Sequence, residues 1–349
     1  MEWKYDQKEL KKRHALRISR GVSASSTNLF VTVQTKTHFG IGEAAPGAGA
    51  ETAELCQQQL NDFLHTQDEI KLNPFDCWFA AREAAIAPCA LAAVDIALWD
   101  LHGKAAGQPL HKLLGLPSRS VATSVTIGIL PPDEVRERVA EILDLTDAKF
   151  LKIKLGNPSG IDADQMMYMK VWESIQGHDV GLRVDANGGW TLDDSKEMIK
   201  WLSERKAEYI EQPLAEGNED QLKFLFKGRN LPIFVDESLR FAEDIPRVAN
   251  FVDGINLKLM KCGGITEALR ILNTARAFGL KTMIGCMSES SVSISAGASL
   301  TGIIDYVDLD SHYNLSPDPS SGAKMVNGIT MTNNSNGHGA QLNIENYAE

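Results

Sequence analysis

From residue 117 onward the chain repeats one unit, a short apolar run followed by a segment with helical periodicity. Strands that alternate with helices pair in parallel through right-handed crossovers, and eight such units can close a barrel. We therefore predict an α/β fold, a modified (β/α)8-type barrel whose last helix is weak or missing. An open doubly wound sheet is the alternative, but no G-x-G-x-x-G turn follows the first run. The apolar runs are 121–128, 150–154, 180–185, 209–211, 233–236, 254–258, 281–285 and 306–310, and the helices between them are expected at about 133–146, 161–176, 191–206, 218–227, 241–250, 265–278 and 289–302.

Three successive apolar runs end on an acid: Asp185, Glu211 and Asp236. The acids are 26 and 25 residues apart, close to the length of one strand, one helix and two turns. One such acid alone is more often a solvated helix N-cap. Three in phase would meet at one rim of a parallel barrel, where carboxylate oxygens form a site for a hard divalent cation.

Lysines end the neighbouring runs on either side of these acids. Lys152 and Lys154 are two residues apart and share one face of a strand, which is predicted to point into the barrel rather than to an exposed edge. Like-charge repulsion from Lys152 would lower the pKa of Lys154 and suit it to act as a base. Lys258 ends the sixth run, across the ring; Lys261 is an alternative, but it falls past the strand end. A cation flanked by two lysines suits removal of a proton next to a carboxylate on one face and its return on the other.

Asp308 and Asp310 end the eighth run, and their spacing of two residues places them on one face. They lie on the far side of the ring from the three-acid arc. One interpretation is a solvated strand end. The other is a pocket for a substrate cation, for which an ammonium group is the natural candidate.

Five motifs resemble the enolase superfamily, and their order and spacing are most similar to its muconate-lactonizing subgroup. They are KIK at 152–154, DAN at 185–187, EQP at 211–213, DES at 236–238 and NLKLMKCGG at 256–264. The resemblance covers nearly all of the chain and implies an α+β capping domain over 1–117, to which 316–349 returns, and a barrel over 118–315.

The resemblance also implies roles for the charged residues. A lysine base acting with Mg2+ is established for this superfamily. By analogy Asp185, Glu211 and Asp236 would bind one Mg2+ per subunit, Lys154 and Lys258 would be the acid/base pair, and Lys152 would tune its neighbour.

Within the subgroup, the D-x-D at 308–310 and the Met-Ser-Glu-Ser at 287–290 resemble the dipeptide epimerases. This likeness implies that Asp308 and Asp310 bind the N-terminal ammonium of a dipeptide and that Ser288 and Glu289 line the substrate pocket. The reaction would be epimerisation at the α-carbon of the C-terminal residue through an enediolate.

A polar loop at about 19–27 would close over the site, with Arg17 and Thr27 as further substrate contacts. Arg17 or Arg20 could bind an acidic second residue, as in Ala-Glu from cell-wall turnover. Apolar or cationic dipeptides remain open as well.

Other reactions on the same scaffold are the alternative: o-succinylbenzoate synthase, N-acylamino acid racemase, or another lyase or cycloisomerase. Their substrates have no free ammonium, so they leave Asp308 and Asp310 without a use. No histidine stands between Lys281 and Ser290, where related dehydratases carry a base. A non-catalytic homologue is disfavoured because every expected acid and both lysines are present.

Composition bounds the partners. A net charge of -11 and the lack of a basic patch beyond 8–20 argue against nucleic acid or an anionic membrane as partner. Five cysteines without paired spacing predict neither a disulfide framework nor a zinc site. No apolar leader and no uncharged 18-residue run are visible, so we expect a cytoplasmic protein. The sequence leaves homo-oligomerisation open.

Overall fold

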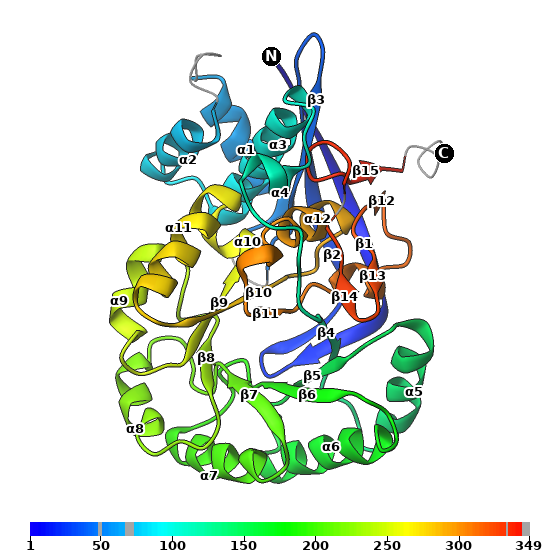
Figure 1. Ribbon diagram of the computed structural model, residues 1–349, viewed down its shortest axis with the longest axis vertical. Coiled ribbons are helices and arrows are strands. Elements are labelled where there is room, and N and C mark those ends of the chain that lie inside the picture. The colour runs from blue at the N-terminus through cyan, green and yellow to red at the C-terminus, as the bar shows by residue number, and fades with distance from the viewer. Residues whose placement is uncertain (48–50, 67–72, 333, 344–349) are drawn as a thin grey trace.

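The computed structural model describes residues 1–47, 51–66, 73–332 and 334–343. Figure 1 shows a barrel of strands ringed by helices and, above it, a smaller cap built from the N-terminal segment. The expected boundaries of the two domains stay a prediction, and parts of the predicted cap (48–50, 67–72, 333 and 344–349) fall outside the described residues.

Eight strands form one parallel sheet in sequential order, from β4 to β11. A bridge between Thr123 and Val307 brings the first strand back to the last, so the sheet is a nearly closed barrel. This confirms the predicted (β/α)8-type fold. The strands are β4 (Ser124–Ile127), β5 (Phe150–Lys154), β6 (Gly181–Asp185), β7 (Ala207–Glu211), β8 (Ile233–Val235), β9 (Gly254–Lys258), β10 (Lys281–Gly285) and β11 (Tyr306–Val307).

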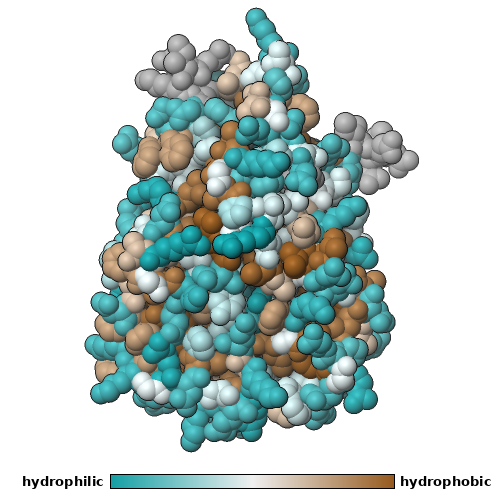
Figure 2. All heavy atoms as spheres, in the orientation of Figure 1, coloured by the Kyte–Doolittle hydropathy of each residue, from teal (hydrophilic) through white to brown (hydrophobic). Residues whose placement is uncertain are grey.

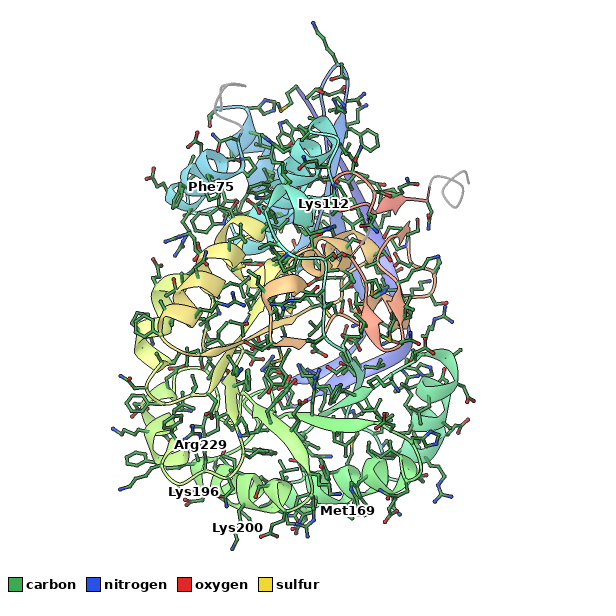
Figure 3. All side chains as sticks on the ribbon, viewed as in Figure 1. Phe75, Lys112, Met169, Lys196, Lys200 and Arg229 are labelled. Carbon is green, nitrogen blue, oxygen red and sulfur yellow. The ribbon has the colours of Figure 1, made fainter. Side chains whose placement is uncertain are left out.

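Outer helices such as α7 turn an apolar face to the strands and a polar face outward, whereas α12 is buried along its whole length. Figure 2 shows hydrophilic side chains along most of the outer rim, and Figure 3 shows Lys196 and Lys200 of α7 at that rim, away from the barrel centre. The helices are α5 (Val135–Leu145), α6 (Ile161–Ser174), α7 (Leu192–Ser203), α8 (Leu222–Phe226), α9 (Ile245–Val248), α10 (Leu259–Cys262), α11 (Ile265–Ala277) and α12 (Ser291–Ala298).

Several elements are shorter than predicted. β11 has only two residues, so Asp308 and Asp310 follow the strand instead of ending it. The helices expected at 218–227 and 241–250 are each a short 3-10 turn joined to α8 or α9, and the eighth unit has only the 3-10 turn Ser311–Asn314. Packing on neighbours, which single-sequence periodicity does not report, decides these ends.

Aromatic side chains fill the barrel on the side of the amino ends of the strands, below the acids. The rings of Tyr209, Phe234 and Tyr306 pack with centroids 4.9–5.3 Å apart, and Tyr306 meets the other two edge to face. The guanidinium of Arg183 lies 3.9 Å above the ring of Phe150 and donates to the carbonyl of Val307. The barrel is therefore filled at this end, and its polar groups can meet substrate only at the mouth formed by the carboxyl ends of the strands.

In the part of the cap that the structure describes, a three-stranded antiparallel sheet packs with helices α1 to α4. Its helix α3 is buried on nearly all sides, as its alanine- and leucine-rich sequence requires. The elements are β1 (Glu2–Ile18), β2 (Gly21–Gln34), β3 (Phe39–Ala44), α1 (Ala53–Leu64), α2 (Pro74–Glu83), α3 (Pro88–Ala105) and α4 (Leu110–Leu113).

The polar loop expected at about 19–27 is wrong in extent. β2 begins at Gly21, and only Ser19 and Arg20 form the turn of a long hairpin with β1. The tip of the hairpin is exposed on both faces, so the sequence shows no alternation of apolar and polar residues there. Residues 21–27 still form a strand, because their backbone groups pair with β1. In Figure 1 this hairpin reaches from the cap down to the barrel beside β4 and β5.

The described part of the C-terminal tail returns to the cap. Leu110 donates its N–H to the carbonyl of Gly337. The ring of His338 hydrogen-bonds the carbonyl of Ile41, and its backbone N–H donates to the carboxylate of Asp100. The tail strands are β12 (Ser320–Ser321), β13 (Met325–Val326), β14 (Ile329–Thr330) and β15 (Gln341–Leu342). Among the described residues, no helix is both long and apolar enough to cross a bilayer.

Candidate active site

The three predicted acids meet at the barrel mouth. Asp185 ends β6, Glu211 ends β7, and Asp236 directly follows β8. One oxygen from each lies within 4.8 Å of the others, and all three residues are at most 1% exposed. Three buried carboxylates this close repel one another unless cations stand beside them.

Four lysines, Lys152, Lys154, Lys258 and Lys261, supply positive charge around this cluster. Nζ of Lys154 lies 2.6 Å from Oδ2 of Asp185, and Nζ of Lys258 lies 2.8 Å from Oδ2 of Asp236. Lys154 and Lys258 come from β5 and β9, on opposite flanks of the acids, and each is 7% exposed. The exposed lysines of α7 contrast with them, since they lie on the outer rim (Figure 3).

Lys152 is fully buried and contacts several acids at once. Its Nζ lies 2.6 Å from Asp308 Oδ2, 2.7 Å from Glu211 Oε2 and 3.6 Å from Asp185 Oδ2. Burial lowers the pKa of Lys152, but these carboxylates outweigh it and raise the pKa well above its usual range. They also offset the charge of Lys152, whose repulsion of Lys154 therefore stays a prediction.

The acids differ in their protonation. Burial raises the pKa of Asp185, but Lys154 and Lys152 outweigh it, so the pKa is lowered overall. The pKa of Asp236 is lowered in the same way by Lys258 and Lys261, which overcome burial. Burial and the charge of Asp185 instead raise the pKa of Glu211 to about 7.

Sharp turns after β6 and β7 place further polar groups around the acids. Asn187 and Gln212 adopt positive φ angles of 44° and 40°, which non-glycine residues accept mainly where surroundings enforce them. Asn187 donates its N–H to Oδ1 of Asp185 at 2.8 Å, and Gln212 accepts the N–H of Asp236 at 2.8 Å. The turns thus orient two of the acids.

Asp308 and Asp310 both lie at the mouth, but their environments differ. Asp308 binds Lys152 and accepts the hydroxyl of Ser124 at 2.6 Å; burial raises its pKa, and the lysine charges lower it overall. Asp310 accepts the N–H of Thr126 at 2.6 Å, and burial together with Asp308 raises its pKa to about 6. Asp308 is therefore already engaged by a lysine.

Ser288 and Glu289 lie in the turn after β10, beside this cluster. Glu289 is 1% exposed, accepts the N–H of Met287 at 2.7 Å, and has its pKa raised to about 8 by burial. Ser288 is half-buried, and its carbonyl accepts a hydrogen bond from Asn28 of the cap.

Arg17 and Thr27 lie apart from the acids and lysines. Both are exposed on the hairpin, and within the described chain neither side chain joins the cluster by a hydrogen bond or ion pair. Arg20, at the hairpin turn, does reach the barrel: it donates to the carbonyl of Asn187 at 2.7 Å and pairs with Glu237 at 2.6 Å. The cap therefore touches the turn that follows β6.

Some residues of the site were not predicted. Asn256, two residues before Lys258 on β9, donates to Oε1 of Glu211 at 2.7 Å. Lys261, the predicted alternative to Lys258, also contacts Asp236 from α10, so this acid pairs with both lysines, and the choice of Lys258 as the acid/base residue stays a prediction. The period-two spacing of Asn256 and Lys258 was a usable signal, because it places both on one face of the strand.

The donor set fits a hard divalent cation. Three carboxylates from consecutive strands supply oxygen ligands, the type that Mg2+ prefers. Oε2 of Glu211 is buried, and the described residue that pairs with it is Lys152, whose Nζ lies 2.7 Å away. A divalent cation would offset the repulsion that remains among the three acids.

Such a barrel, with an acidic cluster flanked by lysines beneath an α+β cap, is the arrangement of the enolase type, and the acidic cluster could bind a metal ion. Residues 134–346 match the enolase C-terminal domain-like family, and residues 5–115 match the mandelate racemase / muconate lactonizing enzyme N-terminal domain. The chain belongs to this family, and the predicted enolase-superfamily isomerase is confirmed.

Named relatives are similar over their whole length. A hydrophobic dipeptide epimerase of Roseobacter litoralis is 58% identical over 344 residues, covering 98% of this chain and 99% of the relative. A hydrophobic dipeptide epimerase of a Flavobacteria bacterium, strain MS024-2A, is 55% identical and covers 100% of both chains. The dipeptide epimerase of Enterococcus faecalis, solved with Mg and L-Leu-L-Tyr, superposes with a TM-score of 0.89 at 32% identity, covering 97% of this chain and 98% of that one.

Proposed function

We propose that the protein epimerises a dipeptide at the α-carbon of its C-terminal residue. The observation that carries the proposal is the placement of Lys154 and Lys258 on opposite flanks of one acidic cluster, with Asp308 and Asp310 at the same mouth. Inversion needs a proton acceptor on one face of the carbon and a donor on the other. The names of the similar epimerases support the same reaction.

Asp185, Glu211 and Asp236 would hold one Mg2+ per chain, as the Mg in the E. faecalis neighbour suggests. When bound, Mg2+ supplies positive charge beside the substrate carboxylate, which lowers the cost of removing the α-proton.

The lysines would perform the proton transfer. One of Lys154 and Lys258 takes the α-proton, and the other returns a proton to the opposite face. Burial lowers the pKa of Lys258, but Asp236 outweighs it and raises the pKa, which favours the ammonium form that donates a proton. Lys152 is held as an ammonium by its ion pairs with three carboxylates, so it would contribute a fixed positive charge and would not transfer a proton.

Asp308 and Asp310 would bind the ammonium of the dipeptide. Asp310 is the freer of the two, because Asp308 already pairs with Lys152. Ser288 and Glu289 would border the bound substrate.

We further propose that apolar dipeptides are preferred. Two relatives at 55% identity or more carry that specificity in their names. Arg20, which could have bound an acidic second residue, has its charge engaged by Glu237, and Arg17 lies apart from the cluster.

The test is α-proton exchange in D2O with Mg2+, read by mass spectrometry. Apolar dipeptides such as L-Leu-L-Tyr should gain one deuteron at the C-terminal residue and yield its epimer, and acidic dipeptides should react more slowly. N-acetylated L-Leu-L-Tyr is the matched control, because it lacks the ammonium. Equal turnover of the acetylated substrate would show that Asp308 and Asp310 do not bind an ammonium and would favour N-acylamino acid racemisation.

A further inference from the structure

Glu43 is a buried carboxylate that the proposed chemistry does not use. It lies in β3 of the cap and is 0% exposed. It accepts hydrogen bonds from Asn28 Nδ2 at 2.7 Å, from the N–H and hydroxyl of Ser290 at 3.0 and 2.8 Å, and from the N–H of Ser293 at 3.2 Å. Every donor is uncharged, so the carboxylate is held by dipoles alone. A buried acid persists in such a place only when its acceptors are fully used.

These hydrogen bonds cross from the cap to the barrel. Ser290 is the N-cap of α12, so Glu43 binds the start of a barrel helix from 247 residues away in sequence. Asn28 Nδ2 also donates to the carbonyl of Ser288 at 2.7 Å. Two residues of the cap thus hydrogen-bond the turn formed by 288–290, Asn28 at its first residue and Glu43 at its last.

That turn borders the proposed site. It follows β10, whose last residue, Gly285, pairs in register with Lys258. The thiol of Cys286 donates to the carbonyl of Asp308 at 3.3 Å. Gly285 and Cys286 therefore link the start of this turn to Lys258 and Asp308.

We propose that Glu43, together with Asn28, is a positioning residue that sets the shape of the substrate pocket through the turn at 288–290. This inference rests on the proposed function and adds a determinant of substrate fit that lies outside the barrel. An ionised carboxylate offers acceptors on both oxygens, whereas an amide of the same size turns one N–H group toward these donors. The turn and the cap would then separate or rearrange, while the lysines and acids of the barrel remain in place.

The test compares three variants with the wild type. Glu43→Gln should raise the KM for L-Leu-L-Tyr about ten-fold, as expected from the loss of one charge-assisted hydrogen bond, with little change in kcat. Asn28→Ala, which removes the bond to Ser288 without placing a new donor, should raise KM in the same direction. The KM for L-Ala-L-Ala should change less, because its small side chains depend less on the pocket wall.

Asp100→Asn is the matched control. Asp100 is also a fully buried acid of the cap, and it accepts the N–H groups of Ile41 and His338, but it does not contact the turn. Its substitution should lower the melting temperature and leave KM unchanged. If Glu43→Gln and Asn28→Ala do no more than Asp100→Asn, Glu43 only stabilises the fold and the inference is wrong.

Hydrogen–deuterium exchange separates this inference from the proposed function, since it needs no substrate. Faster exchange at 286–299 in Glu43→Gln, absent in Asp100→Asn, would support positioning of the turn even if the wild type epimerises no dipeptide. Unchanged exchange there, with an active wild type, would overturn the inference and leave the proposed function standing.

Discussion

Nζ of Lys152 lies 2.6 Å from Oδ2 of Asp308, which joins β5 to the segment after β11 by a buried ion pair. The pair connects the proposed ammonium site to the cluster of three acids, because Nζ of the same lysine lies 2.7 Å from Oε2 of Glu211. A change of charge at Asp308 therefore changes the electrostatic potential at Glu211.

Asp308→Asn should destabilise the protein and reduce epimerisation together. Removing one partner of a buried pair leaves the other charge under-compensated, at a cost of about 3 kcal/mol in the free energy of unfolding. Urea unfolding and dipeptide turnover measure the two effects. The control is Asp193→Asn, which breaks an exposed pair with Lys196 (92% and 50% exposed) and should cost less than about 1 kcal/mol. Equal losses in both variants would show that the Lys152 pair contributes no more than a surface pair.

Lys154→Ala and Lys258→Ala should each lower epimerisation about 10³-fold, the range for loss of a general acid or base. The two variants should differ in what survives. With one lysine left, the α-proton of one stereoisomer still exchanges with D2O, and that stereoisomer should be opposite in the two variants. Lys200→Ala, on the outer rim in Figure 3, is the control and should react as wild type. Exchange of both stereoisomers in either variant would contradict the two-lysine assignment.

The central acids and lysines could be predicted because each lies in or directly after a strand of a regular repeat. Period and parity place such residues at one rim without knowledge of the rest of the fold. Glu43 could not be predicted, because it meets Ser290 across 247 residues and nothing in either local sequence encodes the contact. The hairpin tip was misassigned for a related reason: exposed on both faces, β1 and β2 carry no apolar alternation there.

Removal and return of Mg2+ should change the protonation of Glu211. Burial and Asp185 raise its pKa to about 7, so near neutral pH the residue is partly protonated without a cation. A carboxylate must lose its proton to bind a metal. Calorimetric titration of EDTA-treated protein with Mg2+ in buffers of different ionisation enthalpy should show proton release near pH 7, and affinity that rises from pH 6 to pH 8. Glu211→Gln should abolish the release; proton release that persists in this variant would assign the titration to another group.

Gly285→Ala tests how closely the walls of the site are packed. A Cβ at this position would lie 2.8 Å from Nδ2 of Asn256 and 3.1 Å from Cε of Lys258. Asn256 or Lys258 would have to move, and a displacement of about 1 Å at reacting groups can lower kcat about 100-fold. Steady-state kinetics should show this loss while circular dichroism shows the native fold. Wild-type kcat would mean that both side chains relax without consequence.

His312 should make the protein sensitive to mild acid. His312 is 8% exposed, so its ring is almost wholly shielded from water. Burial lowers its pKa to about 4, below the unfolded value of about 6.5. Between these values the unfolded chain binds more protons than the folded one. The contribution of His312 to the free energy of unfolding is therefore complete above about pH 6.5 and is lost as the pH falls toward 4, by up to about 3 kcal/mol.

Urea unfolding at pH 7.5, 5.5 and 4.5 should therefore show a smaller decrease in the free energy of unfolding with falling pH in His312→Phe than in wild type. His178→Asn, at an exposed histidine, should keep the wild-type dependence. An unchanged pH dependence in His312→Phe would assign the acid sensitivity to other groups.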